Sequence, residues 1–257
     1  MHLLSSRLLR NSLLGLLLLH PFHAPAESAS APTVSIVIDD LGYNTREDRR
    51  AIALPAPVAV AILPHTDRGA ELANEARRAG KEVLLHLPMD PDDDRRAQAG
   101  PGRIENQMSA TEIESMFAYD LQTVPHAIGV NNHMGSRVTQ NRASMQALMR
   151  TIRARGNLFF LDSLTSPHSV AAQVAAENGV PALRRDLFLD SERGERAVSE
   201  SLQQLDRLLL AKGRAIVIGH PYPETLAALE RWLPQAQARG IRVVPPTAML
   251  NTETKRD

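Results

Sequence analysis

Short apolar runs rich in β-branched residues alternate along the chain with longer amphipathic stretches. The short runs predict strands at residues 33–38, 58–63, 82–87, 127–131, 158–162, 181–189, 215–219 and 241–244. The stretches between them carry helix boundary signals, including a capping box in which Ser109 precedes Glu112. A glycine separates a helical stretch from the next strand at positions 80, 156, 179, 213 and 240. The pattern therefore predicts repeated βα units.

Repeated βα units in a chain of this length indicate a parallel sheet that is either closed into a barrel or doubly wound. After the first strand the chain reads "DDLGYN", where a dinucleotide-binding fold would place a glycine-rich phosphate loop. We therefore expect an α/β fold with one barrel domain over residues 33–250. The polar stretch 90–103 is long for a βα connection and is expected to form a loop at the rim.

The first 26 residues have the layout of a secretory signal peptide. Arg7 and Arg10 precede a leucine-rich run at 13–19, and the small-residue pattern Ala24-Pro25-Ala26 follows it. The apolar run is shorter than a bilayer-spanning helix requires, which favours cleavage over an uncleaved anchor. We expect a periplasmic or secreted protein that is not transmembrane after cleavage, with a linker at 27–32 and a flexible tail at 251–257.

The charge and the cysteine content limit the binding partners and the compartment that we expect for this protein. The 29 Lys and Arg residues balance 29 Asp and Glu residues, so the charge gives no reason to expect a nucleic-acid partner. The chain has no cysteine and cannot form disulfides, but its length suffices to bury one large core without them. Together with the signal layout, this composition suits a bacterial periplasm.

Polar residues follow most of the predicted strands. In a parallel βα fold the carboxyl ends of the strands converge on one rim, which is where such folds house their chemistry. The strand ends deliver, in chain order, Asp39, Asp40, His65, His86, Asp90, Asn131, Asn132, His133, Asp162 and His220. Any one of them alone is ordinarily a turn former, a helix cap or a structural histidine. Their coincidence on several strands favours a site, and Asp with His but no Cys suits zinc or a similar divalent ion.

The adjacent carboxylates Asp39 and Asp40 raise a geometric question. Neighbouring residues on a strand point to opposite faces, so the two can serve one site only where the strand is already turning.

Five ordered stretches, "IVIDDLGYN", "LLHLPMDP", "GVNNHMGSR", "FFLDSLTS" and "IGHPYPETL", resemble the divergent polysaccharide deacetylase family from about Val34 to Pro246. The resemblance implies a deformed (β/α) barrel of seven to eight mostly parallel strands. It also implies kinship with carbohydrate esterases that remove N- or O-acetyl groups from polysaccharides. In such enzymes the first Asp of the pair acts as base and the second binds metal, which assigns these roles to Asp39 and Asp40. A late-strand histidine acting as general acid corresponds to His220.

The family's H-x-x-x-H metal motif is absent, because Asp90 stands where the second histidine would follow His86. We predict Asp40, His86 and His133 as the ligands of a divalent metal, with zinc favoured, and keep His65 and Asp90 as reserves. Other candidates keep two interpretations each. Asp162 orients His220 or caps a helix, Arg137 or Arg185 pairs with Asp39 or is structural, and Asn132 is a further rim residue.

The leading functional hypothesis is a metal-dependent polysaccharide deacetylase that uses a metal-activated water on acetyl groups of an envelope glycan, such as peptidoglycan. The main alternative is a non-catalytic periplasmic protein that binds a glycan or an envelope protein partner on the same barrel. A third is a metal hydrolase that cleaves a peptide amide or a phosphoester. The products separate the hydrolases, because only a deacetylase releases acetate.

Overall fold

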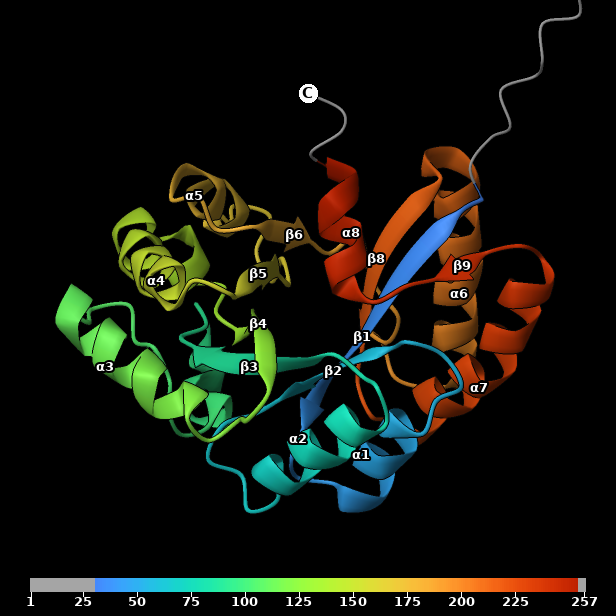
Figure 1. The fold of residues 1–257 in the computed structure, drawn as a ribbon, viewed down its shortest axis with the longest axis horizontal. Helices are drawn as coiled ribbons and strands as arrows, with labels where there is room; N and C mark the ends of the chain where they lie inside the picture. The colour runs from blue at the N-terminus through green and yellow to red at the C-terminus, as the bar shows by residue number, and fades with distance from the viewer. Residues whose placement is uncertain (1–30, 254–257) are drawn as a thin grey trace, which may run out of the picture. The chain divides into compact units, whose positions relative to one another are not determined.

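The computed structural model describes residues 31–253, which belong to one α/β unit (Figure 1). The strands follow the order β6-β5-β4-β3-β2-β1-β8-β7, β9 pairs with β1 beside this path, and each recorded strand pairing is parallel. The strands are β1 (Thr33–Leu41), β2 (Ala59–Ile62), β3 (Val83–Met89), β4 (Ala127–Met134), β5 (Phe159–Asp162), β6 (Ala182–Arg184), β7 (Leu187–Phe188), β8 (Arg214–Gly219) and β9 (Arg242–Val243). The sheet curls into a half-barrel, which confirms the predicted deformed (β/α) barrel.

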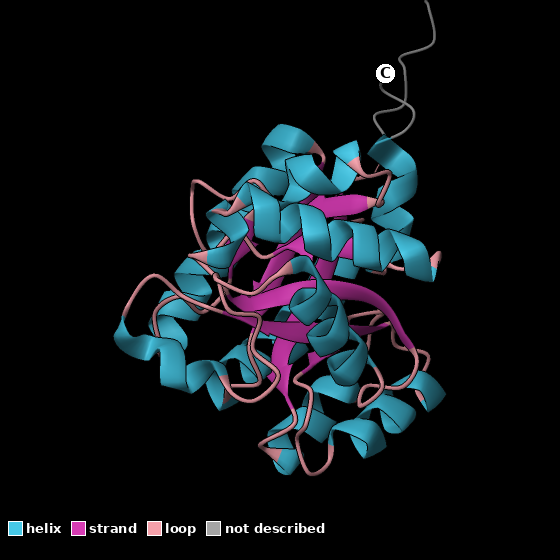
Figure 2. Ribbon diagram, turned by 90° about the vertical axis from the view of Figure 1, so that its left-hand side faces the viewer, coloured by secondary structure: helices cyan, strands magenta, loops and turns pink. Residues whose placement is uncertain are grey.

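Helices connect the strands and cover the outside of the sheet (Figure 2). They are α1 (Thr45–Ile52), α2 (Gly69–Arg78), α3 (Ala110–Leu121), α4 (Arg142–Arg155), α5 (Ala171–Glu177), α6 (Glu195–Lys212), α7 (Pro223–Ala238) and α8 (Pro246–Glu253), with 3₁₀ turns η1 (Asp94–Ala99) and η2 (Val138–Gln140). The capping box predicted at Ser109 is present at the start of α3. Local helix signals in the sequence therefore agree with the fold.

The barrel has a seam between β6 and β7. The apolar run 181–189 was expected to form one strand, but it divides into β6, which pairs with β5, and β7, which pairs with β8. The chain passes from one edge of the seam to the other between Arg185 and Asp186. Arg185 N donates to Asp162 O on one edge (3.0 Å), and Asp186 N donates to Ile216 O on the other (2.8 Å). Since β6 and β7 lie at opposite edges of the strand order, the single-strand prediction was wrong there.

Two buried clusters divide the core. The larger one packs the outer face of the sheet against the helices, and the smaller one contains alternating strand residues, such as Val37, Leu84, Leu161 and Ile218, that face the barrel interior. Met249 of α8 joins the inner cluster, and α8 lies against β1 and β6. Because α8 follows β9, which pairs with the amino-terminal end of β1, Met249 closes the amino-terminal end of the barrel.

The alternation of inward and outward side chains continues to the carboxyl end of the barrel, where the inward positions are polar. Four polar residues each follow an inward-facing apolar residue by two positions. They are Asp39 after Val37, His86 after Leu84, Ser163 after Leu161 and His220 after Ile218. The face that buries the apolar interior thus ends in polar side chains at the carboxyl rim.

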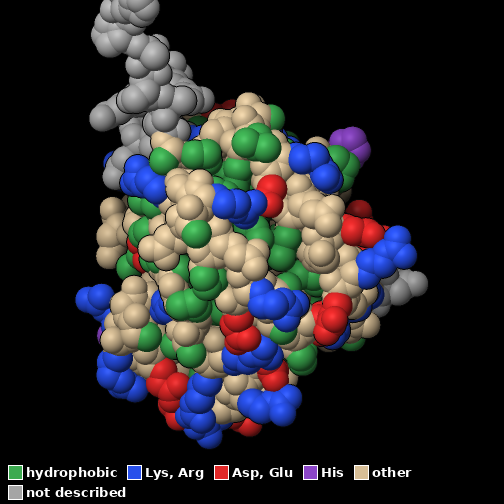
Figure 3. All heavy atoms as spheres, turned by 90° about the vertical axis from the view of Figure 1, so that its right-hand side faces the viewer, with side chains coloured by type: hydrophobic (Ala, Val, Ile, Leu, Met, Phe, Trp, Pro, Cys, Tyr) green, Lys and Arg blue, Asp and Glu red, His purple; other side chains and the backbone are tan. Residues whose placement is uncertain are grey.

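The remaining sequence-based expectations concern the chain ends and the surface. The predicted signal peptide 1–26 and most of the linker 27–32 lie outside the described residues, whereas α8 continues to Glu253 and so extends into the predicted tail 251–257. Within residues 31–253, the helices lack the combined length and apolar character needed to cross a bilayer. On the face in Figure 3, basic and acidic side chains are interspersed.

Replacing Met249 by alanine tests the packing of the barrel interior. Met249→Ala removes a side chain that is 1% exposed, so the free energy of unfolding should fall by about 2–4 kcal/mol in a urea titration. Leu210→Ala is the matched control, because Leu210 is 84% exposed and its truncation should change the stability by less than about 0.5 kcal/mol. Equal stabilities of the two variants would contradict this account of the core.

Candidate functional site

The first strand turns at Asp40, and this turn brings the two adjacent carboxylates to the same side of the sheet. Asp40 has a φ of +61°, in the left-handed region, and the pairing of β1 with β2 shifts register between Ile38 and Leu41. Aspartate enters this region more readily than most residues with a side chain. Asp39 Oδ2 and Asp40 Oδ1 consequently lie 3.6 Å and 3.0 Å from one atom, His86 Nε2.

The residues that follow hold this turn in place. Gly42 N donates to Asp48 Oδ2 (3.1 Å), and the Asp48 side chain is buried. Gly42 has a φ of +137°, and a Cβ at this position would lie 2.5 Å from Thr66 Oγ1. Both the conformation and the close contact therefore require glycine at position 42.

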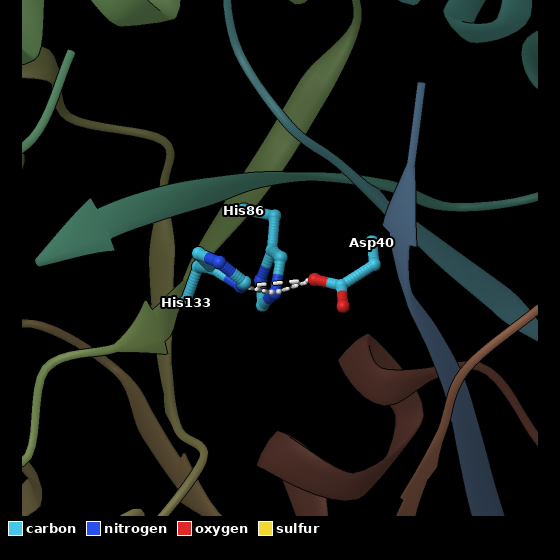
Figure 4. A group of neighbouring side chains, drawn as sticks. All are labelled: Asp40, His86 and His133. Carbon is cyan, nitrogen blue, oxygen red and sulfur yellow. Dashed lines mark hydrogen bonds and ion pairs between the residues drawn. The ribbon is translucent and has the colours of Figure 1, made fainter. Parts of the chain in front are cut away.

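Three potential metal-binding atoms converge at the carboxyl rim (Figure 4). Asp40 Oδ1 lies 3.0 Å from His86 Nε2 and 2.9 Å from His133 Nδ1, and the two nitrogens are 3.1 Å apart. The three side chains come from β1, β3 and β4. Ligand atoms around tetrahedral zinc are roughly 3.3 Å apart when the bonds are about 2.0–2.1 Å, so the three atoms fit one face of such a site.

Asn131 connects the base candidate to this cluster and fixes the tautomer of His86. The Asn131 amide nitrogen donates to Asp39 Oδ1 (2.8 Å), so its Oδ1 faces His86 Nδ1 (2.9 Å). A carbonyl oxygen only accepts, and His86 Nδ1 must therefore carry the hydrogen. In the neutral imidazole this leaves the lone pair on Nε2, which is the form that a metal ligand requires, whereas the protonated ring donates from Nε2 to Asp40 Oδ1 (3.0 Å).

The next residue, Asn132, points to the other side of β4. Its Oδ1 accepts from Ser163 N (2.9 Å), and its amide nitrogen donates to Met134 O (2.8 Å). Asn132 was named as a candidate at the rim, but the structure brings Asn131 into the cluster instead and gives Asn132 a role in holding the strand ends together.

Burial and charge shift the pKa values of the clustered groups in different directions. Burial raises the pKa of the Asp39 carboxyl above its usual value. Burial opposes ionisation of Asp40 as well, but hydrogen bonds with His133 and His86 outweigh it and hold the pKa of Asp40 well below its usual range. For His86, burial lowers the pKa and the nearby Asp39 and Asp40 carboxylates raise it, with a net increase. An anionic carboxylate held between two imidazoles is a favourable environment for a cation.

His220 approaches the cluster from β8 and is oriented by Asp190. Asp190 Oδ1 lies 2.8 Å from His220 Nδ1, while Asp190 Oδ2 accepts from His220 N (2.7 Å) and from Thr225 Oγ1 (2.7 Å). This leaves His220 Nε2 facing the site, 3.8 Å from Asp40 Oδ2. Burial lowers the pKa of His220, but the hydrogen bond and charge of Asp190 outweigh this effect and raise it to about 9.

Asp190 was missing from the sequence-based candidates. It directly follows the predicted strand 181–189, as His220 directly follows the predicted strand 215–219, and this signal could have found it. Asp162 is not the partner of His220. Its two oxygens accept from Leu164 N (2.8 Å) and Ser169 Oγ (2.8 Å), so it organises the loop after β5.

His65 and Asp90, the two reserve ligands, contact other residues. His65 Nε2 is 2.7 Å from Asp120 Oδ1, and the His65 ring stacks on Tyr119. Asp90 Oδ1 is 2.8 Å from Arg103 Nε, so Asp90 holds the rim loop. The structure does not bring either residue into the group formed by Asp40, His86 and His133.

The two arginines considered as partners of Asp39 bind backbone carbonyls. Arg137 Nε donates to Pro91 O (3.2 Å) in the rim loop. Arg185 Nε donates to Ser163 O (2.6 Å), and its guanidinium lies 3.7 Å from the centre of the Phe188 ring. Both arginines therefore stabilise the loops around the site.

The proposed ligands predict a specific pattern of metal binding. Asp40→Ala, His86→Ala and His133→Ala should each lose about one equivalent of bound zinc, measured by elemental analysis after dialysis, because each removes one of three converging donors. His65→Ala is the control for loss of a rim histidine and should keep its zinc. Full occupancy in all three ligand variants would refute the assignment.

Comparison with known proteins places this chain in a family. Residues 36–250 match the family model described as divergent polysaccharide deacetylase. The chain is 37% identical to the uncharacterized protein YibQ of Escherichia coli strain K12 over 201 residues, which cover 78% of this chain and 62% of YibQ. An uncharacterized protein of Haemophilus influenzae is 36% identical over 200 residues, covering 78% and 70%. The match therefore spans less than two thirds of YibQ.

Solved structures share the fold. The uncharacterized protein ATU2773 from Agrobacterium tumefaciens C58 has a TM-score of 0.81 and 27% identity, with 88% of this chain and 92% of that chain covered. BA3943 from Bacillus anthracis, described as a CE4 family pseudoenzyme, has a TM-score of 0.51 and 14% identity, with 86% and 66% covered. Because the family model matches residues 36–250, the chain belongs to the divergent polysaccharide deacetylase family.

Proposed function

We propose that the chain is a metal-dependent deacetylase that hydrolyses acetyl groups on a glycan of the bacterial envelope. The observation that carries the proposal is the convergence of Asp40, His86 and His133, with Asp39 and His220 beside them. Membership of the divergent polysaccharide deacetylase family supports a glycan substrate. The signal-like segment 1–26 supports a location where envelope glycans are accessible.

Asp40 Oδ1, His86 Nε2 and His133 Nδ1 would hold the ion, and two imidazoles with one carboxylate suit zinc. When bound, such an ion lowers the pKa of a water to about 7 and polarises a carbonyl oxygen. The chain's own groups supply the proton transfers.

Asp39 is suited to act as the general base. Asn131 holds its Oδ1 by a hydrogen bond of 2.8 Å, and its Oδ2 is directed toward His86 Nε2. Burial raises its pKa, which makes the carboxylate a better proton acceptor than an exposed aspartate. Asp39 thus accepts the proton from the water that attacks the acetyl carbonyl carbon.

His220 is suited to act as the general acid. Asp190 accepts the hydrogen on Nδ1 and stabilises the imidazolium, so that Nε2 carries a proton at neutral pH. His220 Nε2 donates this proton to the nitrogen or oxygen that leaves when its bond to the acetyl carbon breaks. The products are acetate and a free amine or hydroxyl on the sugar.

A non-catalytic binding protein is the second candidate. The H-x-x-x-H motif is broken, and BA3943, which shares the fold, is described as a pseudoenzyme. Against this candidate, His133 supplies a second imidazole from β4, while Asp90 at the altered position is engaged by Arg103. The loss of the motif therefore leaves three converging donors.

Acetate release from acetylated glycans tests the proposal. The zinc-loaded protein should release acetate from peptidoglycan or acetylated hexosamine oligomers, and Asp39→Asn should lower kcat by about 10²–10⁴-fold, because the amide cannot accept a proton. Asp39→Asn should keep its zinc, because Asp39 is proposed as the general base and not as a metal ligand. An unchanged kcat in Asp39→Asn, or a new peptide amine or free phosphate in place of acetate, would contradict the proposed reaction.

The pH profile tests the role of Asp190. The pKa of His220 is raised to about 9, so activity that needs protonated His220 is present below this value and lost as the pH rises through it. Asp190→Asn removes the stabilising charge, and the alkaline limb of kcat/KM should move down by about one to three pH units. Asp162→Asn is the control and should leave the limb in place. Identical profiles for Asp190→Asn and wild type would exclude the positioning role.

A further inference from the structure

Tyr43 is a large aromatic residue whose side chain is unusually exposed beside the site. Its side chain is 67% exposed, and it follows Asp40 by three residues. Three residues of extended chain span at most about 11 Å, so the Cα atoms of Tyr43 and Asp40 lie within that distance. The backbone that carries the exposed ring therefore lies close to the backbone of the proposed ligand Asp40.

Other aromatic rings at this rim are already stacked. The His220 ring lies between those of Phe188 (6.0 Å) and Tyr222 (5.4 Å), and the ends of this stack are covered by Arg185 and Arg193, the latter 3.5 Å from the Tyr222 ring centre. The half-exposed Tyr119 stacks on His65. Among the described tyrosines, only Tyr43 has no recorded ring contact, which leaves its faces open to a ligand.

The backbone on either side of Tyr43 is fixed. Gly42 is bonded to Asp48 and packed against Thr66, while Asn44 is the N-cap of α1. At the rim loop, a Cβ on Gly100 would lie 3.6 Å from the Tyr43 hydroxyl. A tyrosine on a rigid turn has few torsions to lose on binding and offers an apolar face with a polar tip.

We propose that Tyr43 forms a sugar-stacking subsite for the pyranose unit next to the one that bears the reacting acetyl group. The apolar C–H face of the sugar would pack on the open ring, so the enzyme would favour an oligomer over a single sugar. This inference rests on the proposed function because it places the acetylated unit at Asp40, His86 and His133. A single open ring within residues 31–253 suits one subsite rather than an extended platform, in a chain with 4% aromatic residues.

The kinetic test compares substrates of two lengths. The probes are the β-1,4-linked tetramer of N-acetylglucosamine and the free monosaccharide, with acetate release measured for zinc-loaded wild type, Tyr43→Ala and Tyr43→Phe. Wild type should prefer the tetramer in kcat/KM, and Tyr43→Ala should reduce this preference about tenfold through KM for the tetramer. Tyr43→Phe keeps the ring and should retain the preference.

The control is Leu210→Ala, which removes another exposed apolar side chain on the last turn of α6, at the end of β8 opposite to His220. It should leave the preference for the tetramer unchanged. Acetate release by wild type without a preference for the tetramer, or an equal preference in wild type and Tyr43→Ala, would overturn the subsite.

A binding measurement separates failure of the subsite from failure of the proposed function. Titration calorimetry in the Asp39→Asn background measures binding of the tetramer and the monosaccharide without turnover. Tighter binding of the tetramer that is lost on adding Tyr43→Ala supports the subsite even if wild type releases no acetate, in which case only the hydrolytic function fails. Equal binding of the tetramer with and without Tyr43 overturns the subsite whatever the activity.

Discussion

The site depends on one constraint, which is the left-handed turn of β1 at Asp40. On a regular strand Asp40 would point away from the barrel interior while Asp39 points into it. The turn brings Asp40 Oδ1 to within 3.0 Å of His86 Nε2, and Gly42, Asp48 and Thr66 hold the chain that follows. A left-handed residue with a side chain costs about 1–2 kcal/mol, and the buried contacts of this turn offset that cost.

The position of β1 in the sheet also sets the relation between the two halves of the site. The two histidines of the proposed metal site come from β3 and β4 on one side of β1, whereas His220 follows β8 on the other side and Asp190 lies just beyond β7. Because β1 pairs directly with β2 and β8, it fixes the residues proposed as metal ligands relative to the residue proposed as the general acid. Asn131 adds a second link, since it contacts both Asp39 and His86. The open seam between β6 and β7 therefore does not involve β1, the strand on which the arrangement of these residues depends.

The sequence predicted the local features better than the pairing that depends on distant residues. Strand positions and helix boundaries followed from apolar patterning and glycine spacing, and strand-end reasoning with the family resemblance selected the three residues that the structure brings together. The division of 181–189 into β6 and β7 escaped it, because the polar residues 184–186 within the run were read as part of one strand and the two halves differ in their partners. The choice between Asn131 and Asn132 depends on a register shift at the start of β4 that no apolar pattern reveals. Asp190 lay one residue beyond the run that was considered. Asp162 neither orients His220 nor caps a helix, because its oxygens accept from Leu164 N and Ser169 Oγ in the loop after β5.

The most direct test of the account is X-ray absorption at the zinc K edge of the zinc-loaded protein, because it counts the imidazole ligands. The account predicts one zinc per chain with two imidazole nitrogens, from His86 and His133, and oxygen ligands that include Asp40. A spectrum with no imidazole or one imidazole would show that the three side chains do not act together. Three imidazoles would mean that another histidine, such as His220, binds the metal and cannot serve as the acid. Either result would contradict the central claim.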